Sequence, residues 1–337
     1  MIIEPLDAAD PEALAAWHDC YFASSTSDRE ISTPYMLEEL RAQFLTDSHG
    51  EKTLALTGTE DGTVVAVGWV GLPTQDNLHM AWTELHTRPG HRNRGHGSAM
   101  LERLTEVALQ HGRRTLTAEA SFPYECPADG AGHPHSDFLT HRGFTFGIGD
   151  VMRALDLPSD QALLERLADE AAPHHRDYEV RQFVGPVPDD IIDSFGELVG
   201  SLMTEAPVGE LELEPEVIDA ARIRANEQVL EESGRSRYTT VAMAPDGSVA
   251  AYSELVLPSH DPGRVYQWGT LAHPDHRGHR LGLATKTRNL AWLQRERTDL
   301  RLLITYNAEV NSHMIAVNEA MGFRPVERMG EFQKKIG

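Results

Sequence analysis

The spacing of apolar residues changes several times along the chain, and each change predicts a new element. Apolar positions at helical spacing, among them Met100, Leu104 and Val107, predict a helix over residues 94–109. Short apolar runs broken by turn residues predict strands. The first half is expected to contain, in order, a strand at 2–3, helices at 10–22 and 35–44, strands at 54–56, 63–70 and 79–86, the helix at 94–109, a strand at 114–118, a loop at 121–137, a short helix and a strand at 144–155.

The same succession then returns. A connecting helix over 158–172 places Leu163, Leu164 and Leu167 on one side. After it we expect a strand at 178–180, helices at 189–203 and 215–232, strands at 238–242, 249–257 and 265–272, a helix at 281–293, a strand at 301–305, a helix at 312–321 and a strand at 326–332.

Two landmarks recur at nearly the same separation. The step along the chain from Arg92 to Arg277 almost equals the step from the pair Gly143-Phe144 to the pair Gly322-Phe323. This agreement argues that a whole domain has been duplicated. We therefore predict an α/β fold class, of the α+β type with mixed sheets, with domains at 1–157 and 175–337 joined by a linker helix at 158–174.

Composition narrows the classes of partner. The 337 residues carry a formal net charge of -22, which argues against a nucleic-acid binder because phosphate contacts need a positive surface. An acidic field attracts cationic molecules, although acidic surfaces also serve solubility. The chain has no apolar run near the roughly 18 residues of a membrane helix, no signal-peptide pattern and two cysteines. We expect a cytoplasmic monomer or homodimer without a membrane partner.

Two glycine-containing loops carry the chemistry. They are Arg92-Asn93-Arg94-Gly95-His96-Gly97 and Arg277-Gly278-His279-Arg280-Leu281-Gly282, each between a predicted strand and a predicted helix. Glycine lets backbone approach a ligand, and a helix start offers free N–H groups and positive dipole charge to a pyrophosphate. One such loop alone is equally well a tight turn, but two copies with the same neighbours favour an anion site. Neither is a P-loop or a Rossmann fingerprint.

With these loops the chain resembles the GNAT superfamily of N-acetyltransferases, whose V-x-P-x-x-R-x-x-G-x-G/A segment cradles the CoA pyrophosphate. Segments 89–97 and 274–282 carry the resemblance. Segment 311–323 matches the family's later N-x-x-A-x-x-x-Y-x-x-x-G-F helix, whereas 138–144 keeps only its end. The resemblance implies two tandem GNAT acyltransferase folds, a layout similar to the tandem GNAT proteins of actinobacteria, a group that includes mycothiol synthase.

The resemblance also implies acetyl-CoA as co-substrate and a set of residues around it. These are Leu85, His86, Thr87, Arg92, Arg94, Gly95, His96, Gly97 and Ser98 in the first half, and Leu271, Ala272, Arg277, Gly278, His279, Arg280, Leu281, Gly282, Leu283, Asn307, Asn311 and Asn318 in the second.

Both halves depart from the family pattern. The family's tyrosine, often the acid for the departing thiolate, falls on Leu139 and on Asn318. Arg280 replaces a glycine of the second loop, whereas the first loop is complete. A thiol pKa of about 8.5 lets the thiolate leave unprotonated, so loss of the tyrosine does not exclude activity. Because Asn311 and the Gly322-Phe323 pair are intact, we favour the second half for the chemistry.

Amide formation needs a neutral amine. An ordinary amine has a pKa of about 10.4, so a base must take its proton at neutral pH. Glu84 and Glu254, both on predicted strands, are the candidate bases, although an ordinary strand carboxylate is the commoner role for such a residue. We predict acetyl transfer to a primary amine of a small, cationic molecule by direct attack in a ternary complex. The alternative is a non-catalytic acyl-CoA-binding or regulatory protein with degenerate GNAT domains.

The remaining polar clusters give weaker indications. His273, His276 and His279, like His133 and His135, lack paired cysteines or an H-E-x-x-H frame, so we expect no metal. Tyr306 and Asn307 are candidates for ligand contact or for core and turn positions. The segments 23–50 and 203–235 should form the acceptor pocket, where no motif is visible. The acidic run 203–214 is either its lining or a solvated loop.

Overall fold

The structure, a computed structural model, describes residues 1–46, 50–205 and 207–337, with the side chains of Met203 and Thr204 also outside the description. The chain forms two compact units. The first comprises Met1–Gly149, Gly209–Glu212 and Arg328–Gly337, and the second comprises Asp150–Val208 and Leu213–Glu327. Each unit therefore combines segments that are distant in sequence. The domain boundaries expected at 157 and 174 were placed from the sequence repeat, and they do not coincide with the boundaries of these two units.

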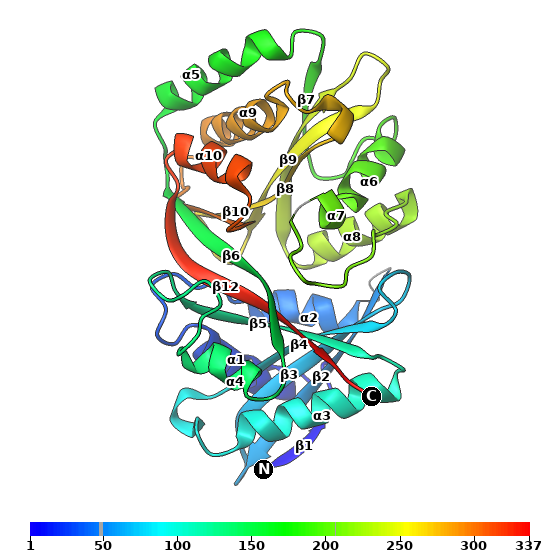
Figure 1. The fold of residues 1–337 in the computed structure, drawn as a ribbon, viewed down its shortest axis with the longest axis vertical. Helices are drawn as coiled ribbons and strands as arrows, with labels where there is room; N and C mark the ends of the chain where they lie inside the picture. Colours follow the sequence, from blue (N-terminus) through cyan, green and yellow to red (C-terminus); the bar gives the residue numbers. More distant parts are fainter. Residues whose placement is uncertain (47–49, 206) are drawn as a thin grey trace. The chain divides into compact units, whose positions relative to one another are not determined.

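The first unit follows the predicted order of elements (Figure 1). Asp10 caps the first long helix by accepting from the backbone N–H groups of Glu12 and Ala13. The last helix begins at Pro134, inside the stretch expected to be a loop. The elements are β1 Ile2–Pro5, α1 Pro11–Ser25, α2 Leu37–Leu45, β2 Glu51–Glu60, β3 Thr63–Pro73, β4 Met80–Thr87, the 3-10 turn η1 Pro89–His91, α3 His96–Gln110, β5 Thr115–Pro123 and α4 Pro134–Thr140.

The rest of the chain repeats this order, although the start of β6 and the end of β12 belong to the first unit. The helix expected at 189–203 is two helices, and the one expected from 215 begins at Ala220, where the Asp219 side chain accepts from the Arg222 N–H. The elements are β6 Thr145–Asp156, α5 Gln161–Ala171, η2 Ala172–His174, β7 Glu179–Val184, α6 Ile192–Gly200, α7 Leu202–Glu205, α8 Ala220–Glu232, β8 Arg235–Met243, β9 Val249–Pro258, β10 Arg264–Ala272, η3 Pro274–His276, α9 Leu281–Glu296, β11 Leu302–Ala308, α10 Ser312–Ala320 and β12 Arg324–Lys335.

Each unit contains a mixed sheet, which confirms the expected fold class. In the first unit the strand order is β1-β2-β3-β4-β5-β12, and in the second it is β6-β11-β10-β9-β8-β7. Two strands are divided between the units, because β12 belongs to the first unit only from Arg328 and β6 to the second only from Asp150. In each sheet one central pair is parallel, β4 with β5 and β10 with β11, among antiparallel neighbours. No described helix is long and apolar enough to cross a membrane.

The parallel pairs separate before their strands end. The register of β4 with β5 runs from Met80 opposite Thr115 to Thr83 opposite Ala118, although β4 continues to Thr87. The register of β10 with β11 stops in the same way after Gln267, although β10 continues to Ala272. A fork therefore opens inside each sheet, at the end that leads into the glycine-containing loop.

The helix expected to act as a linker belongs to the core of the second unit. Leu164 and Leu167 of α5 are buried in the same apolar cluster as Leu290 and Leu293 of α9. The three-to-four-residue spacing of leucines along α5 matches this buried face. The helix therefore stabilises the second unit in addition to connecting the sequence repeats.

Replacing Leu164 by alanine should test this packing. Leu164 is fully buried, so Leu164→Ala is expected to lower the free energy of unfolding by roughly 2–5 kcal/mol through lost burial and the cavity left behind. Asp169→Ala, at an exposed position of the same helix, should change it by less than about 0.5 kcal/mol. Urea unfolding monitored by circular dichroism measures both, and equal effects would contradict the assignment of α5 to a core.

Candidate functional site

The fork in the first unit leaves part of β4 with a free backbone edge. Residues 84–87 still pair with β3, from Trp69 opposite Glu84 to Ala66 opposite Thr87, but lie beyond the register with β5. The backbone groups on the β5 side of this segment are therefore available to a ligand. The predicted cofactor residues Leu85, His86 and Thr87 all lie on this edge.

The loop that follows brings the start of α3 next to the fork. Asn93 and Gly95 both have positive φ, 62° and 86°, and Gly95 occupies the N-cap of α3. Because glycine has no side chain, it cannot cap the amides of His96, Gly97 and Ser98 in the first helical turn. The uncapped amides and the helix dipole suit an anion, and anion binding by this loop stays a prediction.

Glu84 stands at the mouth of the fork with a histidine as partner. Its carboxylate lies 2.7 Å from the Nε2 of His86, two residues further along β4. The Glu84 side chain is 41% exposed and that of His86 only 14%. The His86 ring packs edge-on against Tyr21 of α1 and stacks on Trp69 of β3. Helix α1 and strand β3 thus fix the imidazole, while the carboxylate remains accessible.

Arg142 is a site residue that sequence reasoning missed. Its guanidinium donates to the Ser98 hydroxyl in the first turn of α3 and to the Phe138 carbonyl, and it stacks 3.8 Å from the Phe138 ring centroid. A Cβ on Gly97 would come within 3.2 Å of Phe138, so this glycine also makes room for α4. Arg142 precedes the Gly143-Phe144 pair, and no local pattern indicates that α4 brings it to the loop.

The loop arginines differ in their partners. Arg92 pairs with Asp28 at 3.3 Å, and Arg94 donates to the Gly90 carbonyl. In the second unit Arg277 forms an ion pair with Glu205 at 2.5 Å. Glu205 belongs to the acidic run expected near the acceptor, of which Ala206 lies outside the described residues. One carboxylate of that run is therefore engaged by the second loop.

The rest of the second loop is held by α5 and η2. Arg280 adopts a left-handed conformation, φ 52°, as N-cap of α9 and donates to the Glu170 carbonyl. This conformation costs a non-glycine residue on the order of 1 kcal/mol. His279 contacts the His174 carbonyl through Nδ1. Of the other predicted residues, Leu271 and Ala272 end β10, Gly278 lies in the loop, and Leu281, Gly282 and Leu283 begin α9.

Glu254, the second candidate base, lies inside the second unit. Only 6% of it is exposed, and its carboxylate lies 3.2 Å from Arg237, which also pairs with Glu227 at 2.9 Å. Burial raises the pKa of Glu254, Arg237 opposes the rise and Glu227 adds to it. A base must reach its substrate, so this burial counts against Glu254, whose role stays a prediction.

Asn318, at the family's tyrosine position in the second unit, is part of a buried polar chain. Its side chain accepts from Lys286 of α9 and donates to Asn307 of β11, which accepts from Arg153 of β6. Burial, together with the charge of Arg153, lowers the pKa of Lys286 to about 7. Both polar groups of Asn318 are therefore used within the protein. Asn307, the member of this hydrogen-bonded group on β11, lies beyond the register of β11 with β10.

In the first unit, leucines occupy the positions that correspond to Asn318 and Lys286 of the second unit. Leu139 and Leu101 are both 4% exposed and belong to the same apolar cluster. Leu101 follows Arg92 by the same number of positions as Lys286 follows Arg277. Asn311, by contrast, has a structural explanation, because its side chain accepts from the Met314 N–H and caps α10. The intact asparagine that favoured the second half thus accounts for a helix start and does not require a ligand.

The comparisons with known proteins agree with this geometry. Residues 12–125 match the model of the Acetyltransferase (GNAT) family. Over its whole length the chain is similar to a solved tandem GNAT protein from the clavulanic acid biosynthesis pathway, with 26% identity, a TM-score of 0.80 and coverage of 100% of this chain and 98% of that one. Segment 12–125 matches the GNAT family, and the whole chain is similar in fold to a tandem GNAT protein. The expected family is thereby confirmed, and the protein belongs to the acyltransferases.

Other solved structures are similar to the chain in fold alone. A GCN5-related N-acetyltransferase from Sphaerobacter thermophilus is 12% identical, with a TM-score of 0.64 and coverage of 99% and 95% of the two chains. An acetyltransferase described as putative from Pyrococcus horikoshii is 11% identical, with a TM-score of 0.59 and coverage of 100% and 89%. A search of curated proteins gives no match. The matched family segment lies in the first unit.

Glu254→Gln should reveal the buried carboxyl through the pH dependence of stability. Because the folded pKa of Glu254 is raised, its contribution to stability is complete below the unfolded pKa and is lost as the pH rises through the folded value. Glutamine does not titrate, so the variant should gain stability relative to wild type between about pH 5 and pH 8. Urea midpoints at both pH values measure this, with exposed Glu102→Gln as control. A stability difference independent of pH would contradict the buried carboxyl.

Proposed function

We propose that the first unit binds acetyl-CoA and transfers its acetyl group to the primary amine of a small, cationic molecule by direct attack in a ternary complex. The observation that carries this proposal is the open fork between β4 and β5, with the accessible Glu84 at its mouth and the uncapped start of α3 beyond it. The second unit, whose polar groups are engaged internally, serves as a structural partner.

Three features suit the cofactor. The edge of β4 at 84–87 offers backbone donors and acceptors to the two amides of the pantetheine arm, as an open strand does to a peptide. The amides of His96, Gly97 and Ser98 suit the pyrophosphate. Arg142 lies beside them through Ser98, and Arg92 adds a second positive charge. The 26%-identical tandem GNAT protein is itself described without acetyl-CoA.

Glu84 fits the role of base better than Glu254 does. An incoming ammonium group with a pKa of about 10.4 must lose a proton before attack, and Glu84 takes it directly or through a water. His86, 2.7 Å away, holds the carboxylate and can relay the proton to solvent. The amine nitrogen then bonds to the thioester carbonyl carbon, the carbon–sulfur bond breaks, and the nitrogen loses its second proton to solvent. The thiolate leaves without a tyrosine and takes up one proton from solvent at neutral pH, so the reaction releases one proton overall.

The acceptor is proposed from charge alone. A net charge of -22 attracts cations over long range, and the expected pocket segments 23–50 and 203–235 include residues 47–49 and 206, which lie outside the description. We place the protein in the cytoplasm as a monomer or homodimer without nucleic-acid partners.

The alternative, a non-catalytic acyl-CoA-binding protein, is favoured by the absence of a tyrosine at Leu139 and Asn318.

Glu84→Gln tests the base. With acetyl-CoA and an accepted amine, kcat at pH 7 should fall by about 10²–10⁴-fold, the usual contribution of a general base, while the KM for acetyl-CoA changes little. Raising the pH should restore part of the rate as the free amine becomes more abundant. Release of CoA thiol, with Glu102→Gln as control, measures the effect. An unchanged kcat would refute the assignment, and acetyl-CoA binding without turnover across polyamines, aminoglycosides and amino acid derivatives would favour the alternative.

A matched pair of loop variants tests which unit binds the cofactor. Arg92 and Arg277 occupy equivalent loop positions and each pairs with one carboxylate. Calorimetric titration should give one acetyl-CoA per chain. Arg92→Ser should weaken binding at least about 10-fold, as expected for a lost charged hydrogen bond, and Arg277→Ser should leave it unchanged. Two sites per chain, or the reverse ranking of the variants, would contradict the assignment to the first unit.

A further inference from the structure

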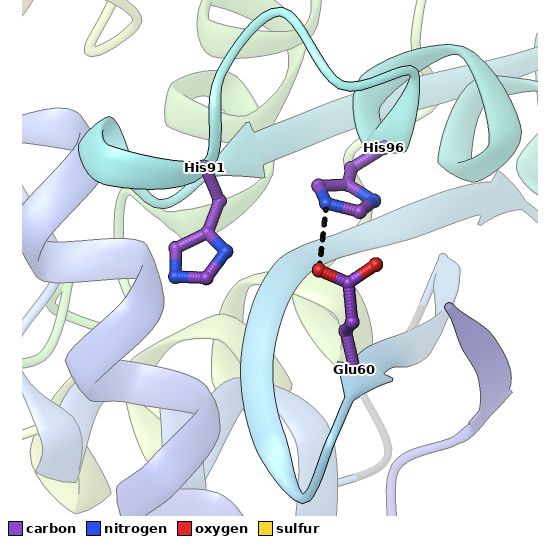
Figure 2. Close-up of side chains that lie close together, drawn as sticks. All are labelled: Glu60, His91 and His96. Carbon is purple, nitrogen blue, oxygen red and sulfur yellow. Dashed lines mark ion pairs between the residues drawn. The ribbon is translucent and has the colours of Figure 1, made fainter.

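Three side chains that the proposed reaction does not use converge at the base of the first loop. Glu60 ends β2, His91 ends η1 and His96 begins α3. One possible ligand atom from each lies within 4.8 Å of the other two, and the His96 Nε2 is 3.5 Å from the Glu60 carboxylate. Figure 2 shows the three side chains pointing toward a common space from three separate segments.

The histidines at this place have unsatisfied nitrogens. His96 is only 5% exposed, and its Nε2 has the 3.5 Å ion-pair contact with Glu60 but no hydrogen bond. Among the described residues the Nδ1 of His91 has no hydrogen-bond partner either. Buried polar atoms are nearly always paired, because desolvation without a partner costs free energy. An ion between the two lone pairs and the carboxylate would satisfy all three groups at once.

We propose that Glu60, His91 and His96 bind one divalent transition-metal ion of the zinc class. Two imidazoles and one carboxylate form a donor set that zinc uses with a water in its fourth position, whereas magnesium and calcium prefer oxygen ligands. Ligand atoms about 2.0–2.2 Å from the ion lie roughly 3.3 Å apart in a tetrahedron. The His96–Glu60 separation already approaches this value, and the longer separations close by side-chain rotation.

An ion at this position would hold the first loop in place. His91 and His96 stand on either side of the loop residues 92–95, so an ion bound to both ties the two ends of this loop to each other and, through Glu60, to β2. The positive end of the α3 dipole opposes a cation here, and the Glu60 carboxylate offsets that repulsion. The metal binding does not depend on the proposed acetyl transfer.

The second unit supplies an internal comparison. When the two loops are aligned on Arg92 and Arg277, the equivalent positions hold Pro245, His276 and Leu281. Only His276 keeps a ligand type, and its Nδ1 lies 3.0 Å from the Tyr178 hydroxyl. The site is therefore specific to the first unit and replaces our expectation of no metal, which rested on other histidines. His276→Gln is a matched control.

The test is titration of full-length protein, freed of metal by chelator and dialysis, with Zn²⁺ alone. Calorimetry should give one ion per chain, and Co²⁺ in its place should give the visible absorption of a four-coordinate ion. His91→Gln and Glu60→Gln should each weaken Zn²⁺ binding by at least the ~10–100-fold typical of losing even an outer partner, whereas His276→Gln should not. Zn²⁺ should also slow amide hydrogen exchange over residues 92–98.

Three results would overturn the proposal. They are no Zn²⁺ binding by wild-type protein, equal binding by His91→Gln and Glu60→Gln, or a loss of binding in His276→Gln of the same size. Both ligand variants alter partly exposed side chains, and circular dichroism establishes that they fold. Because acetyl-CoA and amine are absent from the titration, its outcome is separate from that of the acetyl-transfer experiments.

Discussion

Parallel pairing that stops halfway along two continuing strands is the constraint from which the rest of the first unit follows. Beyond Thr83 and Ala118 the backbone of β4 faces a gap inside its own sheet, and buried backbone groups need partners. A ligand with its own amides can supply them. The same strand carries Glu84 and leads into the loop and the start of α3, so one irregularity in pairing aligns a polar edge, an accessible carboxylate and an anion site.

In the second unit, side chains near the fork are engaged in internal hydrogen bonds. The Gln267 side chain, at the last residue of β10 that pairs with β11, donates to the Glu254 carbonyl and to the Ser253 hydroxyl of β9, next to an irregularity in the β9–β10 pairing. On the other strand of the fork, Asn307 joins Asn318 and Lys286 in hydrogen bonds. Duplication thus gives two copies of one frame, in which one copy keeps its polar groups available and the other uses them in its core.

Local patterns predicted the frame well. The turns at Asp61-Gly62 and Asp246-Gly247, the apolar face of α3 and the repeated order of elements all depend on neighbours close by in the sequence, and each is present. The boundaries were less predictable where a cap decides them, as at Asp219 before α8. The helix assigned as a linker shows a further limit, because its leucine face was visible in the sequence but the partner, α9, was not.

The sequence by itself determined the duplication, the class of fold and the positions of the two glycine-containing loops, because repeat spacing, hydrophobic period and glycine position are written along the chain. Only the tertiary structure decided that Glu84 has a histidine partner and is accessible while Glu254 is buried against Arg237. It also decided that Arg142, just after α4, reaches Ser98 and that Glu60, on a strand well before the loop in sequence, lies beside two histidines. Exposure and convergence arise from packing between distant segments, and no pattern of neighbouring residues records which segments will meet.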